Sequence, residues 1–227
     1  MEIGATKAVQ DRLKTTKIEE SKGASLVFCW DTHLTKIKGR NVLFIVNASN
    51  RYTIAMTDIE PRNWNYYTMY IRSVIHGVMQ EMGYSEDQIG QYFKMSGDTT
   101  VTKTHGRKSV GGINRMVMDA QYFGKKLEKE AKYQWELSEY LNRDICQPEG
   151  FDAYGYPSEL FKLDMERLGI AAKREPAKVI DFAQYIENNR GTNDSAIKLF
   201  LAEISLRDYS FHRWTSKPTE YYSVHSK

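Results

Sequence analysis

Residues 33–57 decide the fold, and they read HLTKIK, GRN, VLFIV, NASN and RYTIAMT in succession. The first and last of these segments alternate polar and apolar side chains with a period of two, which is typical of half-buried strands. The segments GRN and NASN supply residues typical of tight turns. The run Val42–Val46 is apolar throughout, so we predict it to be the central strand, covered on both faces. With the apolar stretch Ser25–Trp30 before it, this region predicts a three- or four-stranded antiparallel meander.

The segments on either side of this meander add strands and helices. Residues 2–4 are predicted as a short edge strand, followed by a helix capped by Thr6. From residue 64 to residue 82 apolar side chains recur every three or four positions, which predicts an amphipathic helix. Ser85, with acids behind it, predicts the cap of a second helix, and Thr99–Thr104 is β-prone enough for a fifth strand. We therefore predict an α+β fold in which a small antiparallel sheet of about four to five strands packs with helices.

The second half of the chain has a different pattern. Lysine and glutamate recur at helical spacing in Lys125–Tyr140, which predicts an exposed helix. Further helices and an aromatic tail are expected at Ser158–Leu168, Pro176–Asn188, Asn193–Leu206 and Tyr209–Lys227. We accordingly predict two domains: an α+β domain over residues 1–125 and a helical extension with an aromatic tail over residues 126–227.

The composition excludes several classes of protein. The 227 residues are 41% hydrophobic and 27% charged, as in ordinary globular proteins. No stretch approaches the ~20 apolar residues of a membrane helix, and the first residues lack the layout of a signal peptide. There is no CxxC pair, and Cys29 lies in an apolar stretch, as a small buried hydrophobic residue does. These features predict a reduced, cytoplasmic protein without a membrane partner.

Positive charge is concentrated in the first half of the chain. Residues 1–126 hold 18 Lys and Arg against 12 Asp and Glu, and the remainder is net negative. The segment TTVTKTHGRKSVGGINR, residues 99–115, contains no acid. We expect a strand, a glycine-bearing loop from His105 to Gly112, and a helix from about Ile113, whose free N–H groups suit a phosphate or carboxylate. The candidate nucleic-acid or phosphate-binding residues are Lys103, Arg107, Lys108, Ser109, Asn114 and Arg115.

The same segment has a simpler interpretation, as a solvated turn between a strand and a helix. It matches neither GxxxxGK[ST] nor GxGxxG. Its histidine, His105, is the candidate catalytic residue, because a histidine among cations can act as acid or base in phosphodiester cleavage. The basic neighbours are expected to lower its pKa and favour the base role. No histidine has a second His, Cys or Glu at metal-ligand spacing, so we predict no metal and no cofactor.

Residues 1–125 resemble a bacterial family known only as a domain of unknown function. The resemblance is carried by Ala5-Thr6-Lys7 with Leu13, Trp30–His33, Val42–Asn47, Ser49–Tyr52, and the closing pattern Thr102-Lys103-Thr104, Arg107, Ser109-Val110, Gly112 and Asn114. It implies that these residues form one unit that includes the basic segment, in short intracellular bacterial proteins, some of them phage-related. It implies no activity and no catalytic residue.

Two main functions and a third remain open at this point. The first is a nucleic-acid-directed protein that binds RNA or DNA through the basic segment, with or without cleavage by His105. The second is a non-catalytic protein–protein interaction or oligomeric accessory factor, favoured by the helical second half and the aromatic tail. The third is a binder of a small anion or nucleotide. The sequence leaves open whether the protein is an enzyme.

Overall fold

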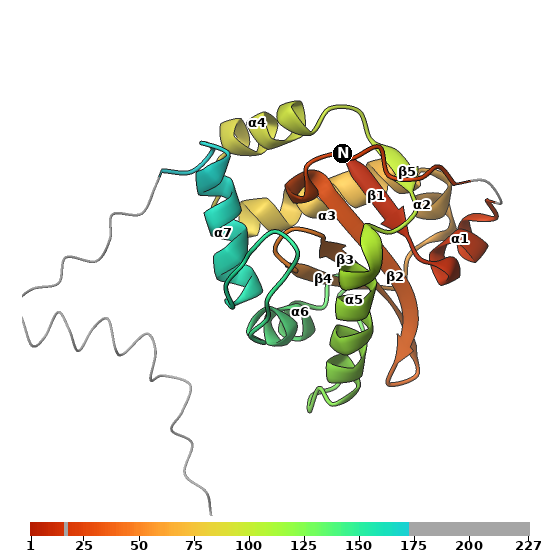
Figure 1. Ribbon diagram of the computed structural model, residues 1–227. Coiled ribbons are helices and arrows are strands. Elements are labelled where there is room, and N and C mark those ends of the chain that lie inside the picture. The colour runs from red at the N-terminus through yellow and green to blue at the C-terminus, as the bar shows by residue number, and fades with distance from the viewer. Residues whose placement is uncertain (16–17, 173–227) are drawn as a thin grey trace, which may run out of the picture. The chain divides into compact units, whose positions relative to one another are not determined.

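The computed structural model describes residues 1–15 and 18–172 (Figure 1). Within them, five strands form one mixed sheet in the order β4-β3-β2-β1-β5. The strands are β1 (Glu2–Ala5), β2 (Cys29–Ile37), β3 (Arg40–Asn47), β4 (Thr53–Thr57) and β5 (Thr100–Thr102). Strands β2, β3 and β4 are antiparallel neighbours, which confirms the meander, whereas β1 is parallel to both β2 and β5. The α+β fold is thus confirmed, with a sheet that is mixed.

Two strands occupy different places in the sheet from those predicted. Strand β3 is buried on both faces as expected, and Val42 through Ile45 have no exposed surface. The middle position, however, belongs to β2. The prediction of an edge strand at residues 2–4 is wrong, because β1 lies between β2 and β5. Its partner β5 comes about a hundred residues later, so no local sequence pattern predicts that the two strands pair.

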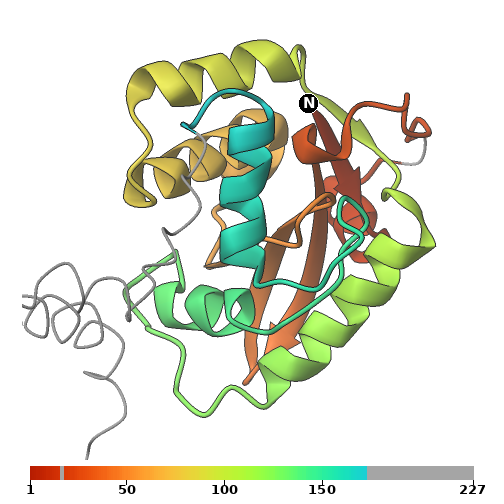
Figure 2. The same ribbon diagram turned by 60° about the vertical axis from the view of Figure 1, so that its left-hand side comes forward.

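Helices cover both faces of the sheet. They are α1 (Lys7–Leu13), α2 (Pro61–Asn65), α3 (Tyr67–Glu81), α4 (Glu86–Ser96), α5 (Gly106–Gln121), α6 (Trp135–Asn142) and α7 (Pro157–Arg167), with a 3₁₀ turn at Leu26–Phe28. Alternate residues of β3 point to opposite faces, so Leu43 and Ile45 join the core formed with α3, α4 and α7. Phe44 and Val46 join the core formed with α5 and α6. Figure 2 shows α5 across the sheet from α3 and α4.

Helix α4 begins at the predicted cap. The hydroxyl of Ser85 accepts a hydrogen bond from the backbone N–H of Gln88, and the Gln88 side chain accepts one from the backbone N–H of Ser85. We expect Ser85→Ala to lower the free energy of unfolding by about 1 kcal/mol, because the backbone N–H of Gln88 then loses its side-chain acceptor and depends on water. Denaturant titration measures this. The control Ser73→Ala, at an exposed position inside α3, is expected to cost nothing, and an equal loss in both variants would contradict the capping role.

Residues 126–172 pack against the same sheet. Strand β4 is an edge strand, and its backbone N–H groups are paired by this region: Thr53 N–H donates to Asn142 Oδ1 at 2.7 Å and Ala55 N–H to Ser138 Oγ at 3.0 Å. Side chains of α6 thus close an edge that would otherwise be open to another strand. The described part of the predicted extension therefore completes the fold of residues 1–125.

The predicted helix over Lys125–Tyr140 is wrong for its first half. The helix begins only at Trp135, and Leu127 and Gln134 before it are buried. The Gln134 side chain bonds to the backbone of Glu128 and Ala131, which holds the preceding segment in an irregular loop. The helix predicted at Ser158–Leu168 is confirmed as α7. The helices predicted at Pro176–Asn188 and Asn193–Leu206, and the tail Tyr209–Lys227, lie outside the described residues.

Candidate functional site

Helix α5 organises the region that the sequence singled out. The prediction of a loop from His105 to Gly112 is wrong, because the helix already begins at Gly106. Its buried positions are spaced at three and four residues, but the first two are Ser109 and Gly112, residue types that are typical of loops. A Cβ atom on Gly112 would lie 0.8 Å from Nη1 of Arg51, so this glycine makes room for a guanidinium group. Gly112 therefore serves the packing of α5 against Arg51, and residues 106–112 are helical instead of forming a glycine loop.

The outer side of α5 carries most of the predicted phosphate-binding residues. Four of them are exposed there: Arg107, Lys108, Asn114 and Arg115. Arg115 has 73% of its side chain exposed and pairs with Asp119, one turn on, at 3.5 Å. Nζ of Lys108 donates to the carbonyl oxygen of Pro148 at 3.2 Å. The structure thus brings four of the six residues onto one helix surface, which we call the α5 basic face.

The other two residues are placed elsewhere. Lys103 follows β5, is exposed, and forms an ion pair with Glu20. Ser109 points inward, where its hydroxyl donates to Oδ2 of Asp31. Ser109 is therefore part of the interior, and a surface ligand would not reach it.

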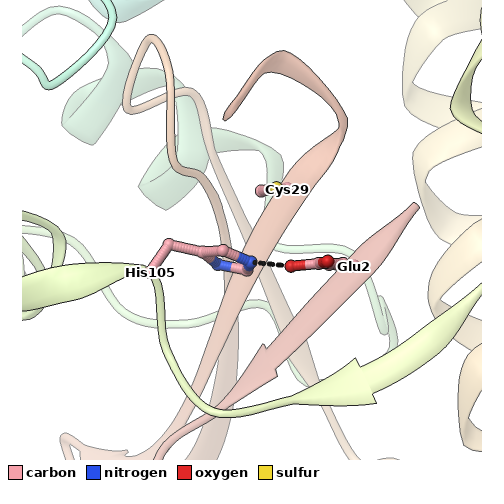
Figure 3. Close-up of side chains that lie close together, drawn as sticks. All are labelled: Glu2, Cys29 and His105. Carbon is pink, nitrogen blue, oxygen red and sulfur yellow. Dashed lines mark hydrogen bonds and ion pairs between the residues drawn. The ribbon is translucent and has the colours of Figure 1, made fainter. Parts of the chain in front are cut away.

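Beneath the first turn of α5 lies a buried polar cluster of Glu2, Asp31, His105 and Ser109. The His105 ring donates from Nδ1 to Asp31 Oδ1 at 2.7 Å and from Nε2 to Glu2 Oε2 at 3.0 Å. The backbone N–H of His105 also donates to the Asp31 carboxylate, at 3.2 and 3.3 Å. The side chains of His105, Glu2 and Asp31 are 2%, 5% and 0% exposed. Figure 3 shows the histidine and the glutamate facing each other between the strands.

The cluster reverses the predicted electrostatics of His105. Burial by itself lowers the pKa of the imidazole, but hydrogen bonds and charge from Asp31 and Cys29 outweigh it and raise the pKa to about 10. Burial likewise opposes ionisation of Glu2, yet hydrogen bonds from Ser21, Lys22 and His105 hold its pKa below the ordinary value. The expected lowering of the His105 pKa is thus wrong, because the neighbours in the sequence are basic and those in space are acidic. At neutral pH the ring is an imidazolium ion, which has no free lone pair for the base role.

Glu2 and Asp31 are site residues that the sequence did not predict. Asp31 is an acid inside a buried strand, and such a charge requires a partner. That signal is visible in the sequence, but the partner is not, since His105 is 74 residues away. Gly4 is a second sequence feature that the cluster explains. It lies opposite Asp31 in the β1–β2 register, and a Cβ atom there would lie 1.8 Å from Asp31 Oδ1.

The helices of residues 1–15 and 18–172 include none with the length and apolar character needed to cross a membrane. Among protein families, residues 2–160 match the model of a domain of unknown function, DUF6933. No curated protein and no solved structure matches the chain. The matched range continues past residue 125 through α6 and into α7, in keeping with the role of α6 in closing the sheet edge. Because the match spans well over half of the 227 residues, the chain belongs to the family described as domain of unknown function DUF6933.

Proposed function

We propose that this protein binds nucleic acid through the α5 basic face. The observation that carries the proposal is that Arg107, Lys108, Asn114 and Arg115 are all exposed on one helix. No Asp or Glu occurs between Thr99 and Met118, so the first three turns of α5 carry no opposing charge of their own. Exposed cations on a rigid element supply the phosphate contacts that dominate affinity for nucleic acids.

The spacing of the cations suits a phosphate backbone. Arg107 and Arg115 are eight residues apart, which on an α-helix is about 12 Å along the axis. That distance is close to the width of the major groove of duplex DNA, which is about 12 Å. The two arginines can therefore reach phosphates on the two sides of the groove. Asn114 lies between the two arginines and offers both a donor and an acceptor to a base edge. The role proposed for His105 is positional: its ion pairs fix the start of α5.

The test is fluorescence anisotropy with short DNA and RNA duplexes. Three phosphate contacts predict that Kd rises about 40-fold between about 50 and about 200 mM salt, and that it is about 1–100 μM near physiological salt. We expect Arg107→Ala/Lys108→Ala/Arg115→Ala to weaken binding at least about 10-fold at the lower salt concentration and to remove most of the salt dependence.

A charge-matched control separates a site from bulk charge. Lys7→Ala/Arg62→Ala/Arg143→Ala removes three exposed cations from other elements and lowers the net charge equally. If the α5 basic face is the binding site, the Kd of this control variant should lie within about twofold of the Kd of the native chain. Equal losses in the two triple variants would reduce the binding to non-specific attraction. Absence of binding to either duplex at the lower salt concentration would refute the proposal.

The second candidate, a protein-interaction surface, is favoured by a different region. Tyr66 and Met69 are 66% and 68% exposed and line a hollow of about 370 Å³ together with Trp64 and Leu13. Exposed apolar side chains beside a hollow are typical of protein contacts. Self-association or partner capture that is insensitive to salt and is lost in Met69→Ser, together with no binding of nucleic acid, would favour this candidate.

A further inference from the structure

Three potential metal ligands of different chemistry converge beside the polar cluster. Glu2, Cys29 and His105 offer a carboxylate oxygen, a sulfur and a ring nitrogen, and these atoms all lie within 4.8 Å of one another. All three residues are buried. Glu2 and Cys29 are register partners in the parallel β1–β2 pair, so both side chains leave the sheet on the same face. His105 approaches that face from the start of α5 (Figure 3).

We propose that Glu2, Cys29 and His105 bind a Zn²⁺ ion. Zinc accepts this mixture of nitrogen, sulfur and oxygen ligands, with bonds of about 2.0–2.3 Å. Neighbouring ligands of a tetrahedral ion then lie roughly 3.3–3.8 Å apart, so the three atoms need to move by only about 1 Å from their present positions. The thiol of Cys29 makes long hydrogen bonds to the carbonyl oxygens of Ser25 at 3.5 Å and Ala24 at 3.7 Å, and its side chain also interacts with His105.

Asp31 supports this assignment from behind the histidine. Metal-binding histidines characteristically donate their other ring N–H to a carboxylate, which fixes the ring and the tautomer. Nδ1 of His105 makes this contact with Asp31 at 2.7 Å, and its Nε2 faces Glu2 and not solvent. The hydroxyl of Ser109 in turn donates to Asp31. The hydrogen bonds thus orient the nitrogen that would bind the ion.

Charge balance makes the exchange between protons and metal feasible in a buried site. Zinc would bind Cys29 as a thiolate, His105 through a deprotonated Nε2 and Glu2 as a carboxylate, and any protons on these atoms would be released to solvent. One thiolate and one carboxylate would then balance the two charges of the ion. The bound site would therefore hold no net charge, which avoids the large penalty of burying one.

The bound ion would have a structural role. The side chains of Glu2 and His105 are no more than 5% exposed, and Cys29 has no exposed surface, so a substrate has no access. The ligands come from β1, β2 and the residue that precedes α5, and a metal would fasten these three elements together. This inference is independent of nucleic-acid binding, because it concerns the buried side of α5 and not its exposed face.

The experiment uses the full-length chain, stripped of metal with a chelator and then titrated with Co²⁺ and with Zn²⁺. A thiolate–cobalt bond gives a charge-transfer band in the near ultraviolet. The chain has two cysteines, so in Cys146→Ser any such band must come from Cys29. We expect Cys146→Ser to bind one Co²⁺ per chain with this band, and Zn²⁺ to displace the cobalt and raise Tm.

The matched variant is Cys29→Ser, which changes one atom. We expect Cys29→Ser to lose the charge-transfer band. Loss of a carboxylate that supports a metal ligand typically weakens binding about 10–100-fold, and we expect loss of the ligand itself to weaken Zn²⁺ binding by more than this. A folded Cys146→Ser protein that gives no cobalt–thiolate band and no Zn²⁺-dependent rise in Tm would overturn the proposal, and the cluster would then be an ion-paired network alone. The measurement on Cys146→Ser distinguishes a zinc site from an ion-paired network without metal, whether or not Cys29→Ser folds.

Discussion

Replacing Asp31 with alanine is expected to lower the free energy of unfolding by about 3–5 kcal/mol, the cost of breaking a buried ion pair by removing one partner. The Asp31 carboxylate accepts hydrogen bonds from the ring and the backbone N–H of His105 and from the hydroxyl of Ser109. The alanine variant leaves the imidazolium of His105 in the interior with Glu2 as its remaining carboxylate partner. The start of α5 and the strands β1 and β2 all depend on this contact.

Denaturant titration in the presence of a chelator measures the effect without any contribution from metal. The control is Asp11→Ala, which removes an exposed i,i+4 ion pair with Lys7 and should cost no more than about 0.5 kcal/mol. The pH dependence is a second check. Because folding raises the pKa of His105 to about 10, the stability it contributes is complete below pH ~6.5 and is lost as the pH rises toward 10. Asp31→Ala should lose less stability than the native chain over this interval. In the denaturant titration, a loss of unfolding free energy in Asp31→Ala that is no larger than the loss in Asp11→Ala would contradict the role of the cluster.

The elements predicted correctly are those whose signals are local. Strand β3 is marked by five consecutive apolar residues, its neighbours by alternation and turn residues, and α4 by the Ser85 cap. A strand flanked by its own hairpin partners carries its pairing in adjacent sequence. The exposure of Arg107, Lys108, Asn114 and Arg115 could also be predicted, because charged and amide side chains mostly stay in water.

The errors arise where distant parts of the chain meet. Strand β1 pairs with β5, which is distant in the sequence. Position 112, inside α5, is a glycine because the Arg51 guanidinium packs against it. The sequence neighbours of His105 predict a basic environment, but folding places Glu2 and Asp31 on its two ring nitrogens. In each case a single residue adapts to a contact made by tertiary structure, which overrides local propensity. A buried acid such as Asp31 is the kind of sequence feature that reveals such a contact in advance.

Gly4→Ala is expected to destabilise the protein by about 3 kcal/mol, combining overpacking with the loss of hydrogen bonds to a charged group. The new Cβ would lie 1.8 Å from Asp31 Oδ1 and 3.0 Å from the Cα of Thr104. Neither neighbour yields cheaply, since the carboxylate is held by the cluster and the other atom is backbone. Denaturant titration measures the loss. The control Gly111→Ala has no atom within 4 Å of its Cβ, so it should gain about 0.5–1 kcal/mol of helix stability.

A double-mutant cycle shows whether Gly4 matters because of Asp31. In an Asp31→Ala background the nearest colliding atom is absent, so Gly4→Ala should cost only about 1 kcal/mol, from the contact with Thr104. The coupling energy between the two sites is then about 2 kcal/mol, well above the additivity expected of independent positions. Additive losses would mean that the glycine serves the strand backbone alone. Coupling of the expected size would mean that β1 carries a glycine because the interior next to it holds a charge.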